Sequence, residues 1–399
     1  MKWAIVTQYW PVREQPYRGH SAFQTIRCLA NSVEVQAFAP QSRYPNWLAP
    51  RNRPWAKTDS TFQPSDIRTT YFDYPALPVV SRFFNGDICA SKLKPLIRNF
   101  APDLILNYWV YPDGYAAVKV GKELGIPVVT TAIGTDLNRS LSGFTRRLTE
   151  WALKNSDLVV TVSQGLAERA VALGAPRNNV TAILNGCDNA IFFPTDKLSS
   201  RSSVNIDGRD ELILYVGRLD PLKGLLELVQ ASAQLSSSRP LLRLVMVGEG
   251  PARRPIEELA KELNFSSRLR LESPCPSAKV AEWMNAADVF ALPSYAEGCP
   301  NVLVEALNCG TPVVASNVGG IPELVDPERA ILVPARQVPA LREALDQALE
   351  KTWNYDLIAS RSRRSWTDTA GDLYTVCADL INTSKSLDPG TLHASATSR

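Results

Sequence analysis

The sequence is poor in the residues that build metal and disulfide sites. Its 399 residues include two histidines, His20 and His393, and seven cysteines that are scattered and never paired as Cys-x-x-Cys. This spacing is typical neither of a disulfide framework nor of a zinc site. We therefore expect reduced thiols, no metal ion and no other bound cofactor.

Long apolar stretches are absent as well. No run in the sequence approaches the roughly 20 residues that cross a bilayer, and the apolar segment at 3–7 is too short for a signal sequence. We interpret this segment as a first buried strand and expect a cytoplasmic protein. Apolar residues make up 45% and charged residues 21% of the chain, as in ordinary globular domains.

The net charge of +3 is unevenly distributed. The first 187 residues carry 21 Lys and Arg against 13 Asp and Glu, and the remainder carries 22 against 27. A basic half can contact an anionic membrane, a phosphorylated acceptor or nucleic acid, or it can be an ordinary solvated surface. The best candidate for peripheral lipid contact mixes basic and aromatic residues: Arg82, Phe83, Phe84, Lys92, Lys94 and Arg98.

Short apolar or β-branched runs alternate with amphipathic stretches along the chain, which predicts parallel sheets built from βαβ units. The length favours two such domains. We place them at 1–187 and 188–365, with a loop at 199–208, a helix at 366–387 and a disordered tail at 388–399. Strands are expected at 3–7, 33–39, 103–109, 127–133, 157–163 and 180–184, and at 211–216, 242–247, 268–271, 288–292, 312–315 and 330–333.

The most informative stretch follows the expected strand at 288–292. Glu297 and Gly298 lie in a loop, a helix is expected to begin near Pro300, and Gly310 is suited to end it. The start of such a helix directs backbone N–H groups and a positive dipole end at its surroundings. It is a natural site for a diphosphate.

Two acidic residues accompany this helix. Asn301 and Glu305 are four residues apart and share one helix face, so the Glu305 carboxylate can accept hydrogen bonds from the two hydroxyls of a ribose. Glu297 can reach further along the ligand, toward a sugar ring. Alternatively, Glu305 faces solvent and Glu297 merely complements the helix dipole.

A second motif follows the expected strand at 211–216. Arg218 and Lys223 emerge from one short loop after Gly217, where two cations can neutralise a diphosphate leaving group. Taken alone, this motif is better explained by solvated side chains beside a turn. The glycine-marked segments 248–251 and 319–320 allow either close approach of a ligand or a plain turn.

In their order and spacing these motifs resemble the glycosyltransferases of family four, which are retaining enzymes with the GT-B fold. The resemblance covers nearly the whole chain. It implies an α/β architecture of two Rossmann-like, doubly wound domains facing across a cleft, with the last helix packing back on the first domain. The matching segments are 185–188 with 193–194, 217–218 with 223–224, 248–251, Glu297 and Glu305 within Glu-Gly-x-Pro-Asn, 310–315 and 319–323.

The resemblance also implies roles for the matching positions. Arg218 and Lys223 would bind the donor diphosphate, and with Glu297, which would bind the transferred sugar, they are the expected catalytic residues. Glu305 would bind the ribose. The other residues expected at the donor are Gly298, Cys299, Pro300, Asn301, Val302, Leu303, Gly217, Gly19 and Asp136, with Pro274 and Cys275 near the base.

The implied activity is a hexosyltransferase-type reaction that moves a sugar from a nucleotide sugar to a glycan or lipid-linked acceptor, with retention and without a metal. The segments 111–114 and 134–138 resemble members that build exopolysaccharides or lipopolysaccharides. This implies a role in cell-surface polysaccharide synthesis, at the inner face of the membrane, with no nucleic-acid partner.

One position departs from the family, because many members have a histidine where this chain has Ile133. A binding protein that has lost transfer is therefore the alternative, although the presence of both Glu297 and Glu305 favours an enzyme. Asp136 either faces the site or caps the turn that follows it, and a direct role of His20 stays open. A dehydrogenase is disfavoured because the loop after residue 7 lacks Gly-x-Gly-x-x-Gly.

Overall fold

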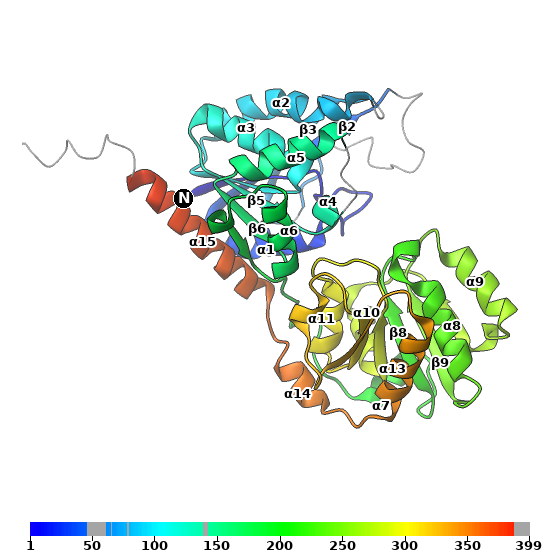
Figure 1. Cartoon of the computed structure of the whole chain (residues 1–399). Coiled ribbons are helices and arrows are strands. Elements are labelled where there is room, and N and C mark those ends of the chain that lie inside the picture. The colour runs from blue at the N-terminus through cyan, green and yellow to red at the C-terminus, as the bar shows by residue number, and fades with distance from the viewer. Residues whose placement is uncertain (46–60, 65, 78–79, 139–142, 387–399) are drawn as a thin grey trace, which may run out of the picture. The chain divides into compact units, whose positions relative to one another are not determined.

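The computed structural model describes residues 1–45, 61–64, 66–77, 80–138 and 143–386, and it divides into two compact units (Figure 1). The first unit contains Met1–Leu184 and the helix that begins at Trp366, and the second contains Asn185–Ser365. The first crossing between the units thus precedes the expected boundary at 187/188 by a few residues. The expected tail at 388–399 lies outside the described residues.

The first unit is built on a parallel sheet with the strand order β3-β2-β1-β4-β5-β6-β7. Its strands are β1 (Lys2–Val6), β2 (Glu34–Arg43), β3 (Arg68–Pro75), β4 (Leu104–Tyr108), β5 (Val128–Ala132), β6 (Leu158–Thr161) and β7 (Val180–Ala182). The sequence did not predict β3. It is an edge strand with alternating buried and exposed residues, so it lacks the apolar run that marks the inner strands.

Side-chain alternation along β1 determines which helices cover each face of this sheet. Trp3 and Ile5 pack with α1 and α15, whereas Ala4 and Val6 pack with α2 and α3. Figure 1 shows α15 beside α1, and the two helices are in contact. The helices are α1 (His20–Leu29), α2 (Asn85–Phe100), α3 (Tyr115–Leu124), α4 (Thr135–Asn138), α5 (Gly143–Asn155), α6 (Gln164–Ala172) and α15 (Trp366–Ser386).

The second unit has a parallel sheet with the order β10-β9-β8-β11-β12-β13 around a single core cluster. The strands are β8 (Glu211–Val216), β9 (Leu242–Val247), β10 (Leu269–Glu272), β11 (Val289–Leu292), β12 (Val313–Ser316) and β13 (Ala330–Val333), each within a residue of its expected bounds. The helices are α7 (Lys197–Ser203), α8 (Leu225–Leu235), α9 (Arg253–Glu262), α10 (Ser277–Ala286), α11 (Asn301–Asn308), α12 (Ile321–Leu324), α13 (Val338–Glu350) and α14 (Tyr355–Ser360).

Helix α7 corrects the loop expected at 199–208. The Asp196 side chain caps the helix by accepting the N–H of Ser199 at 2.8 Å. Arg201 is 5% exposed, and its guanidinium lies 2.6 Å from a carboxylate oxygen of Asp288. The serine-rich composition suggested a linker, but the buried arginine ties this segment to the sheet.

The strand order places the candidate site. In the second sheet β8 lies between β9 and β11, so the chain direction of the crossovers reverses between β8 and β11. Ligands of open α/β sheets bind beyond the carboxyl ends of the strands at this switch point. The loops that follow β8 and β11 carry the motifs around Lys223 and Glu297.

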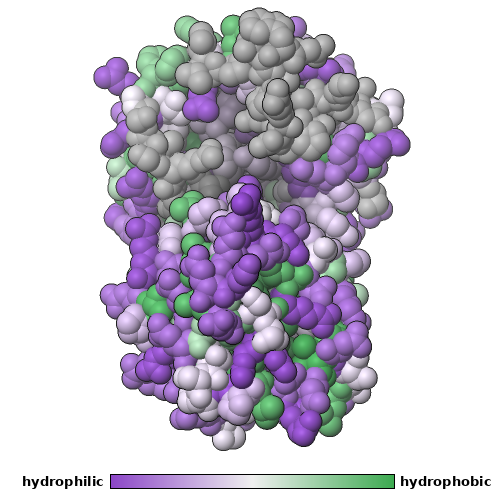
Figure 2. Space-filling model, turned by 90° about the vertical axis from the view of Figure 1, so that its right-hand side faces the viewer, coloured by the Kyte–Doolittle hydropathy of each residue, from purple (hydrophilic) through white to green (hydrophobic). Residues whose placement is uncertain are grey.

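Figure 2 shows one side of the molecule, where hydrophilic residues separate small groups of hydrophobic ones. Large hydrophobic side chains exposed in the second unit include Leu222, Leu226 and Leu263. In the described part of the chain, no helix combines the length and the hydropathy that crossing a membrane requires.

Candidate donor-binding site

The loop after β8, residues 217–224, is a closed turn packed on the loop after β11. The Asp220 side chain accepts the N–H of Leu222 at 3.0 Å. Gly224 has a φ of +65°, and a Cβ at this position would lie 2.1 Å from the carbonyl oxygen of Pro293. Only glycine permits this approach, so the two loops are in backbone contact.

This packing brings Lys223 and Glu297 together. The Lys223 Nζ donates a hydrogen bond to Oε1 of Glu297 at 2.6 Å, and the two side chains are 28% and 11% exposed. The loop after β12 contacts the backbone of Glu297 as well. A Cβ on Gly319, with a φ of +54°, would lie 1.9 Å from the Glu297 carbonyl oxygen. Glycine at 319 is thus required by the chain's own backbone.

Arg218 shares the loop with Lys223 but extends into solvent. Its side chain is 71% exposed, and its Nε lies 3.6 Å from Oδ2 of Asp220. The neighbouring Gly217 packs against the loop after β9, since a Cβ on Gly248 would lie 1.9 Å from the Gly217 carbonyl oxygen. Lys223 is thus held in a partly buried ion pair, whereas Arg218 is largely exposed beside Asp220.

Helix α11 begins where the sequence predicted, at the carboxyl end of a strand. Pro300 is its N-cap, with a ψ of 111°, and the Pro300 side chain makes no capping hydrogen bond. Gly310 follows the helix with a φ of +82°, and its N–H donates to the Leu307 carbonyl oxygen at 3.0 Å. The helix begins four residues after Glu297, and the amino end of a helix suits an anionic ligand.

Asn185 fixes the start of α11, a contact that sequence reasoning missed. Its buried amide donates to the carbonyl oxygen of Cys299 at 3.2 Å and to Oδ1 of Asn301 at 2.8 Å. The Asn-Gly signal at 185–186 by itself indicates only a junction between domains. Nothing in the sequence indicates that the Asn185 side chain reaches a loop more than a hundred residues away.

Glu305 lies one turn into α11 and is partly buried. Burial raises the pKa of its carboxyl to about 7. The thiol of Cys309 lies near it, and the pKa of that thiol is raised to about 12, chiefly by burial and then by the charge of Glu305. A buried carboxyl whose pKa is near neutral, one turn into a helix that begins at the carboxyl edge of the sheet, is a candidate for ligand binding.

The other donor-site candidates of the second unit differ in how far they are buried. Leu303 is fully buried in the core, so it can offer a ligand only its backbone, as expected for 298–303. Burial raises the pKa of the Cys299 thiol to about 11. Pro274 and Cys275 lie in the loop after β10, at the carboxyl edge of the sheet. Gly298 and Val302 are partly exposed.

Gly19 and His20 belong to the first unit, where β1 leads into α1. Gly19 has a φ of +67°, and a Cβ there would lie 1.8 Å from the Tyr9 carbonyl oxygen, so the loop itself requires glycine. The His20 ring packs edge-on against Trp366 of α15, with 6.2 Å between ring centroids. Direct contact of either residue with a substrate stays a prediction.

Asp136 has the geometry of a turn cap. Its Oδ1 accepts the N–H of Gly134 at 2.8 Å and that of Ile133 at 3.2 Å, and the residue is 6% exposed. Burial raises the pKa of Asp136 to about 6 despite these bonds. Asp136 therefore caps the turn that precedes it rather than the turn that follows it, and a part in donor binding stays a prediction.

A further buried carboxyl anchors the loop after β1. Oδ2 of Asp113 accepts the N–H of Gln8 at 2.6 Å, and Oδ1 has no hydrogen-bond partner among the described residues. Burial raises the pKa of Asp113 to about 7. The sequence singled out 111–114 only through its resemblance to polysaccharide-building enzymes.

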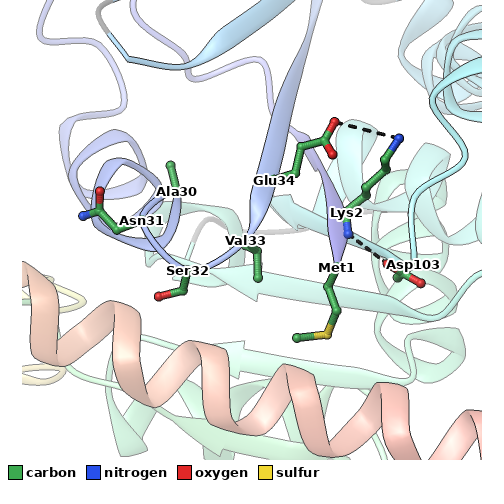
Figure 3. Close-up of a pocket in the computed structure, with 8 residues that line it drawn as sticks. All are labelled: Met1, Lys2, Ala30, Asn31, Ser32, Val33, Glu34 and Asp103. Carbon is green, nitrogen blue, oxygen red and sulfur yellow. Dashed lines mark hydrogen bonds and ion pairs between the residues drawn. The ribbon is translucent and has the colours of Figure 1, made fainter.

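Two of the pockets that the described residues form lie in the first unit. Figure 3 shows one at the amino ends of β1 and β2, the edge opposite to that at which open sheets bind ligands, and we assign no function to it. The other, of about 650 Å³, lies at the carboxyl ends of β2 and β3. Its lining is mostly apolar and includes Tyr44, Tyr74, Leu77, Ile88, Arg43 and Lys92.

Within the described ranges, no group of three or more His, Cys, Asp or Glu side chains could hold a metal ion. That the reaction needs no metal stays a prediction, because a nucleotide sugar can bring a metal with its own phosphates.

Comparisons with known proteins agree with this architecture. Residues 20–190 match the family described as Glycosyltransferase Family 4, and residues 196–368 match the one described as Glycosyl transferases group 1. TuaC of Bacillus subtilis (strain 168), a glycosyltransferase named for teichuronic acid biosynthesis, is 30% identical over 71% of this chain and 74% of its own length. The D-inositol 3-phosphate glycosyltransferase of Stackebrandtia nassauensis is 30% identical over 95% of this chain and 91% of its own.

A solved structure supports the fold. The crystal structure of Anabaena HepE in complex with UDP superposes with a TM-score of 0.75 at 18% identity, covering 95% of this chain and 100% of that one. With two parallel, Rossmann-like sheets and family matches along most of its length, the chain belongs to the family-four glycosyltransferases and is an enzyme with the GT-B fold.

Proposed function

We propose that this enzyme moves a sugar from a nucleotide sugar to a glycan or lipid-linked acceptor with retention of configuration and without a metal ion. The observation that carries the proposal is the Lys223–Glu297 ion pair at the carboxyl ends of β8 and β11, beside the start of α11. The pair brings a cation and a carboxylate together in the loops at this edge of the sheet, and the loop that carries Glu297 leads into the amino end of α11, so these groups suit the diphosphate and the sugar of an activated donor.

In this proposal the diphosphate lies at the start of α11. The three N–H bonds of an ammonium allow Lys223 to keep its bond to Glu297 while it donates to a phosphate oxygen. Arg218, already exposed, adds a second charge without breaking a buried contact. Charge that develops on the leaving diphosphate is then stabilised by groups already in place.

The two carboxylates bind the ribose and the transferred sugar of the donor. Glu305 accepts hydrogen bonds from the ribose hydroxyls, and Glu297 accepts one from a hydroxyl of the transferred sugar. HepE, whose fold this chain shares, was crystallised with UDP, so uracil is the first base to test. The loop with Pro274 and Cys275 is the proposed place of the base.

The transfer step needs no base other than the departing diphosphate. The acceptor hydroxyl attacks the anomeric carbon on the face from which the diphosphate leaves. The bond between that carbon and the diphosphate oxygen breaks, and the hydroxyl proton passes to the departing diphosphate. Attack on the leaving-group face retains the anomeric configuration.

The acceptor is proposed to bind in the first unit. The pocket at the carboxyl ends of β2 and β3 is within the size range of small-ligand sites. It combines the aromatic rings of Tyr44 and Tyr74 with the charged groups of Arg43 and Lys92, a combination suited to a sugar or a phosphorylated lipid headgroup. Together with the likeness to TuaC, this supports a role in cell-surface polysaccharide synthesis.

A membrane contact is proposed near the same pocket. Phe83 and Phe84 are 40% and 60% exposed, and Phe144 of α5 packs edge-on against Phe83. Lys92 is exposed, whereas Lys94 is paired with Glu123 at 2.7 Å. We expect sedimentation with anionic but not neutral vesicles, and weaker sedimentation of a Phe83→Ser/Phe84→Ser variant. Equal binding of both proteins would contradict the proposal.

A donor screen tests the enzyme directly. Nucleotide sugars of uracil, guanine and adenine are added in a thermal-shift assay, since a ligand of the folded state raises the melting temperature. The selected donor is then incubated with candidate acceptors, the released nucleoside diphosphate is measured, and the product anomer is assigned by NMR. A stabilising donor with no release of diphosphate under any condition would favour the binding-only alternative, and an inverted product would refute retention.

A further inference from the structure

Tyr295 ties the loop that carries Glu297 to the elements that carry Lys223. Its backbone N–H donates to the carbonyl oxygen of Leu222 at 2.9 Å. Its hydroxyl donates to Oε1 of Glu227, which lies in the first turn of α8. One residue thus bridges the β11 loop, the β8 loop and α8.

The ring of Tyr295 is held from another side by Arg336. The Arg336 guanidinium lies 4.3 Å from the ring centroid, a cation–π contact. Arg336 follows β13 and has a φ of +64°, a left-handed conformation that is uncommon for residues other than glycine. Backbone of this kind persists where the surrounding structure favours it, and it clusters at functional sites.

The anchor at Tyr295 is relevant to the reaction because it lies close to Glu297 in the sequence. Glu297 is two residues beyond Tyr295, and its carbonyl oxygen is confined by Gly319 on the other side. Burial, and then the bond to Glu227, raises the pKa of Tyr295 to about 12, so the hydroxyl remains a donor at any ordinary working pH. The loop is therefore held at Tyr295, two residues before the carboxylate, and at the backbone of Glu297 itself.

We infer that Tyr295 is a positioning residue that, anchored by Glu227 and Arg336, sets the Glu297 carboxylate against the transferred sugar. This inference rests on the proposed function of Glu297. The nucleotide half of the donor has separate contacts, at Glu305 and the start of α11, which do not involve Tyr295. Loss of the anchor therefore impairs transfer and sugar recognition while leaving nucleotide binding intact.

Three substitutions isolate the anchor. Tyr295→Phe keeps the ring under Arg336 and removes only the hydroxyl, Glu227→Ala removes its acceptor, and Glu227→Gln keeps an acceptor oxygen. We expect Tyr295→Phe and Glu227→Ala each to lower kcat about 5- to 100-fold, the range over which small misplacements act. Glu227→Gln should recover most of the activity, and the Tyr295→Phe/Glu227→Ala double variant should be no worse than either single variant.

The readout that separates positioning from general damage is binding of UDP, or of the diphosphate of whichever base the donor screen selects. Its Kd should stay within about twofold of the wild-type value in every variant, because nucleotide contacts are spared. Tyr355→Phe, an exposed tyrosine of the same unit, is the matched control.

Three outcomes overturn the inference. Wild-type kcat in Tyr295→Phe, with Glu297→Ala inactive, refutes the anchor but spares the proposed function. Parallel losses of turnover, nucleoside-diphosphate binding and melting temperature would mean a general structural role. Wild-type activity in Glu297→Ala would refute the proposed function of Glu297 and the inference together.

Discussion

At the scale of single residues, the site depends on a lysine that already has a partner. Lys223 and Glu297 form a partly buried ion pair, and both are held by backbone contacts of neighbouring loops. Removing one partner from such a pair leaves the other charge poorly solvated. The pair therefore couples diphosphate binding to the place of the carboxylate that is proposed to contact the sugar.

Lys223→Ala should abolish most turnover. It removes the cation proposed to stabilise the leaving diphosphate, for which we expect a loss of about 100- to 1,000-fold in kcat. Steady-state kinetics with the screened donor provide the measurement. Lys261→Ala, at an exposed lysine on α9 of the same unit, is the control and should match the wild type. If Lys223→Ala also matches the wild type, the site assignment is refuted.

Glu305 should make donor affinity depend on pH. Its pKa of about 7 leaves it largely protonated at pH 6 and ionised at pH 8. The ionised form accepts more hydrogen bonds from ribose, so the donor should bind about 5- to 10-fold more tightly at pH 8 than at pH 6. The diphosphate bridge of a nucleotide sugar does not titrate in this range, so calorimetry isolates the protein group.

Variants of Glu305 check the assignment. Glu305→Ala should weaken donor binding at pH 8 by about 10- to 100-fold, because two hydrogen bonds to a charged group are lost. Glu305→Gln should bind weakly at both pH values and lose the slope. A pH slope that persists in Glu305→Gln would assign the titration to another group.

At the scale of elements, four loops at the carboxyl edge of the second sheet touch through their backbones. Gly224 meets Pro293, Gly319 meets Glu297, and Gly248 meets Gly217, each where a Cβ would overlap a carbonyl oxygen. These contacts make the loops one packed layer. A substitution that displaces one loop is therefore expected to displace residues of the loop that it contacts.

Gly319→Ala tests this layer. The added Cβ would meet the Glu297 carbonyl oxygen at 1.9 Å, and alanine at a φ of +54° costs about 1 kcal/mol or more by itself. We expect a lower melting temperature and a loss of turnover. Gly371→Ala is the opposite case: in α15, no described atom lies within 4 Å of its added Cβ, and the variant should gain about 0.5–1 kcal/mol. Equal melting temperatures in the two variants would contradict the clash.

At the scale of the whole molecule, buried carboxyls make stability depend on pH. The pKa values of Asp113 and Asp136, both in the first unit, are raised by burial to about 7 and about 6. The folded state therefore binds these protons more tightly than the unfolded state. The stability that the two protonated carboxyls contribute is fully present below about pH 4, the pKa of aspartate in the unfolded state. It is lost as the pH rises through 6 to 7.

Asp113→Asn should reduce this dependence. The amide oxygen can still accept the N–H of Gln8, but the side chain no longer ionises. The variant should resemble the wild type at pH 5.5 and melt at a higher temperature than the wild type at pH 8.5. Melting curves of the full chain between these pH values provide the measurement. A difference that is the same at every pH would mean that Asp113 does not titrate in the folded state.

Local signals determined much of this protein. Every described strand other than β3 begins within a residue of its expected start, because buried parallel strands are continuous apolar runs. Glycine and proline marked the start and end of α11, since their backbone preferences act within a few residues. The order of these motifs along the chain was sufficient to indicate the family. The sequence could not indicate β3, whose apolar residues alternate, or α7, which is held by the buried Arg201.

Tertiary structure decided which of the indicated side chains meet. Lys223 and Glu297 are 74 residues apart, and they pair because glycines allow two loops to touch. Arg218, five residues before Lys223, extends into solvent, and Asp136 turns inward to cap its own turn. No local sequence pattern distinguishes a side chain that forms the ion pair from one that extends into solvent or caps a turn. Propensity and periodicity act over a few residues, whereas the contacts of a site depend on how distant loops close on one another in the folded chain.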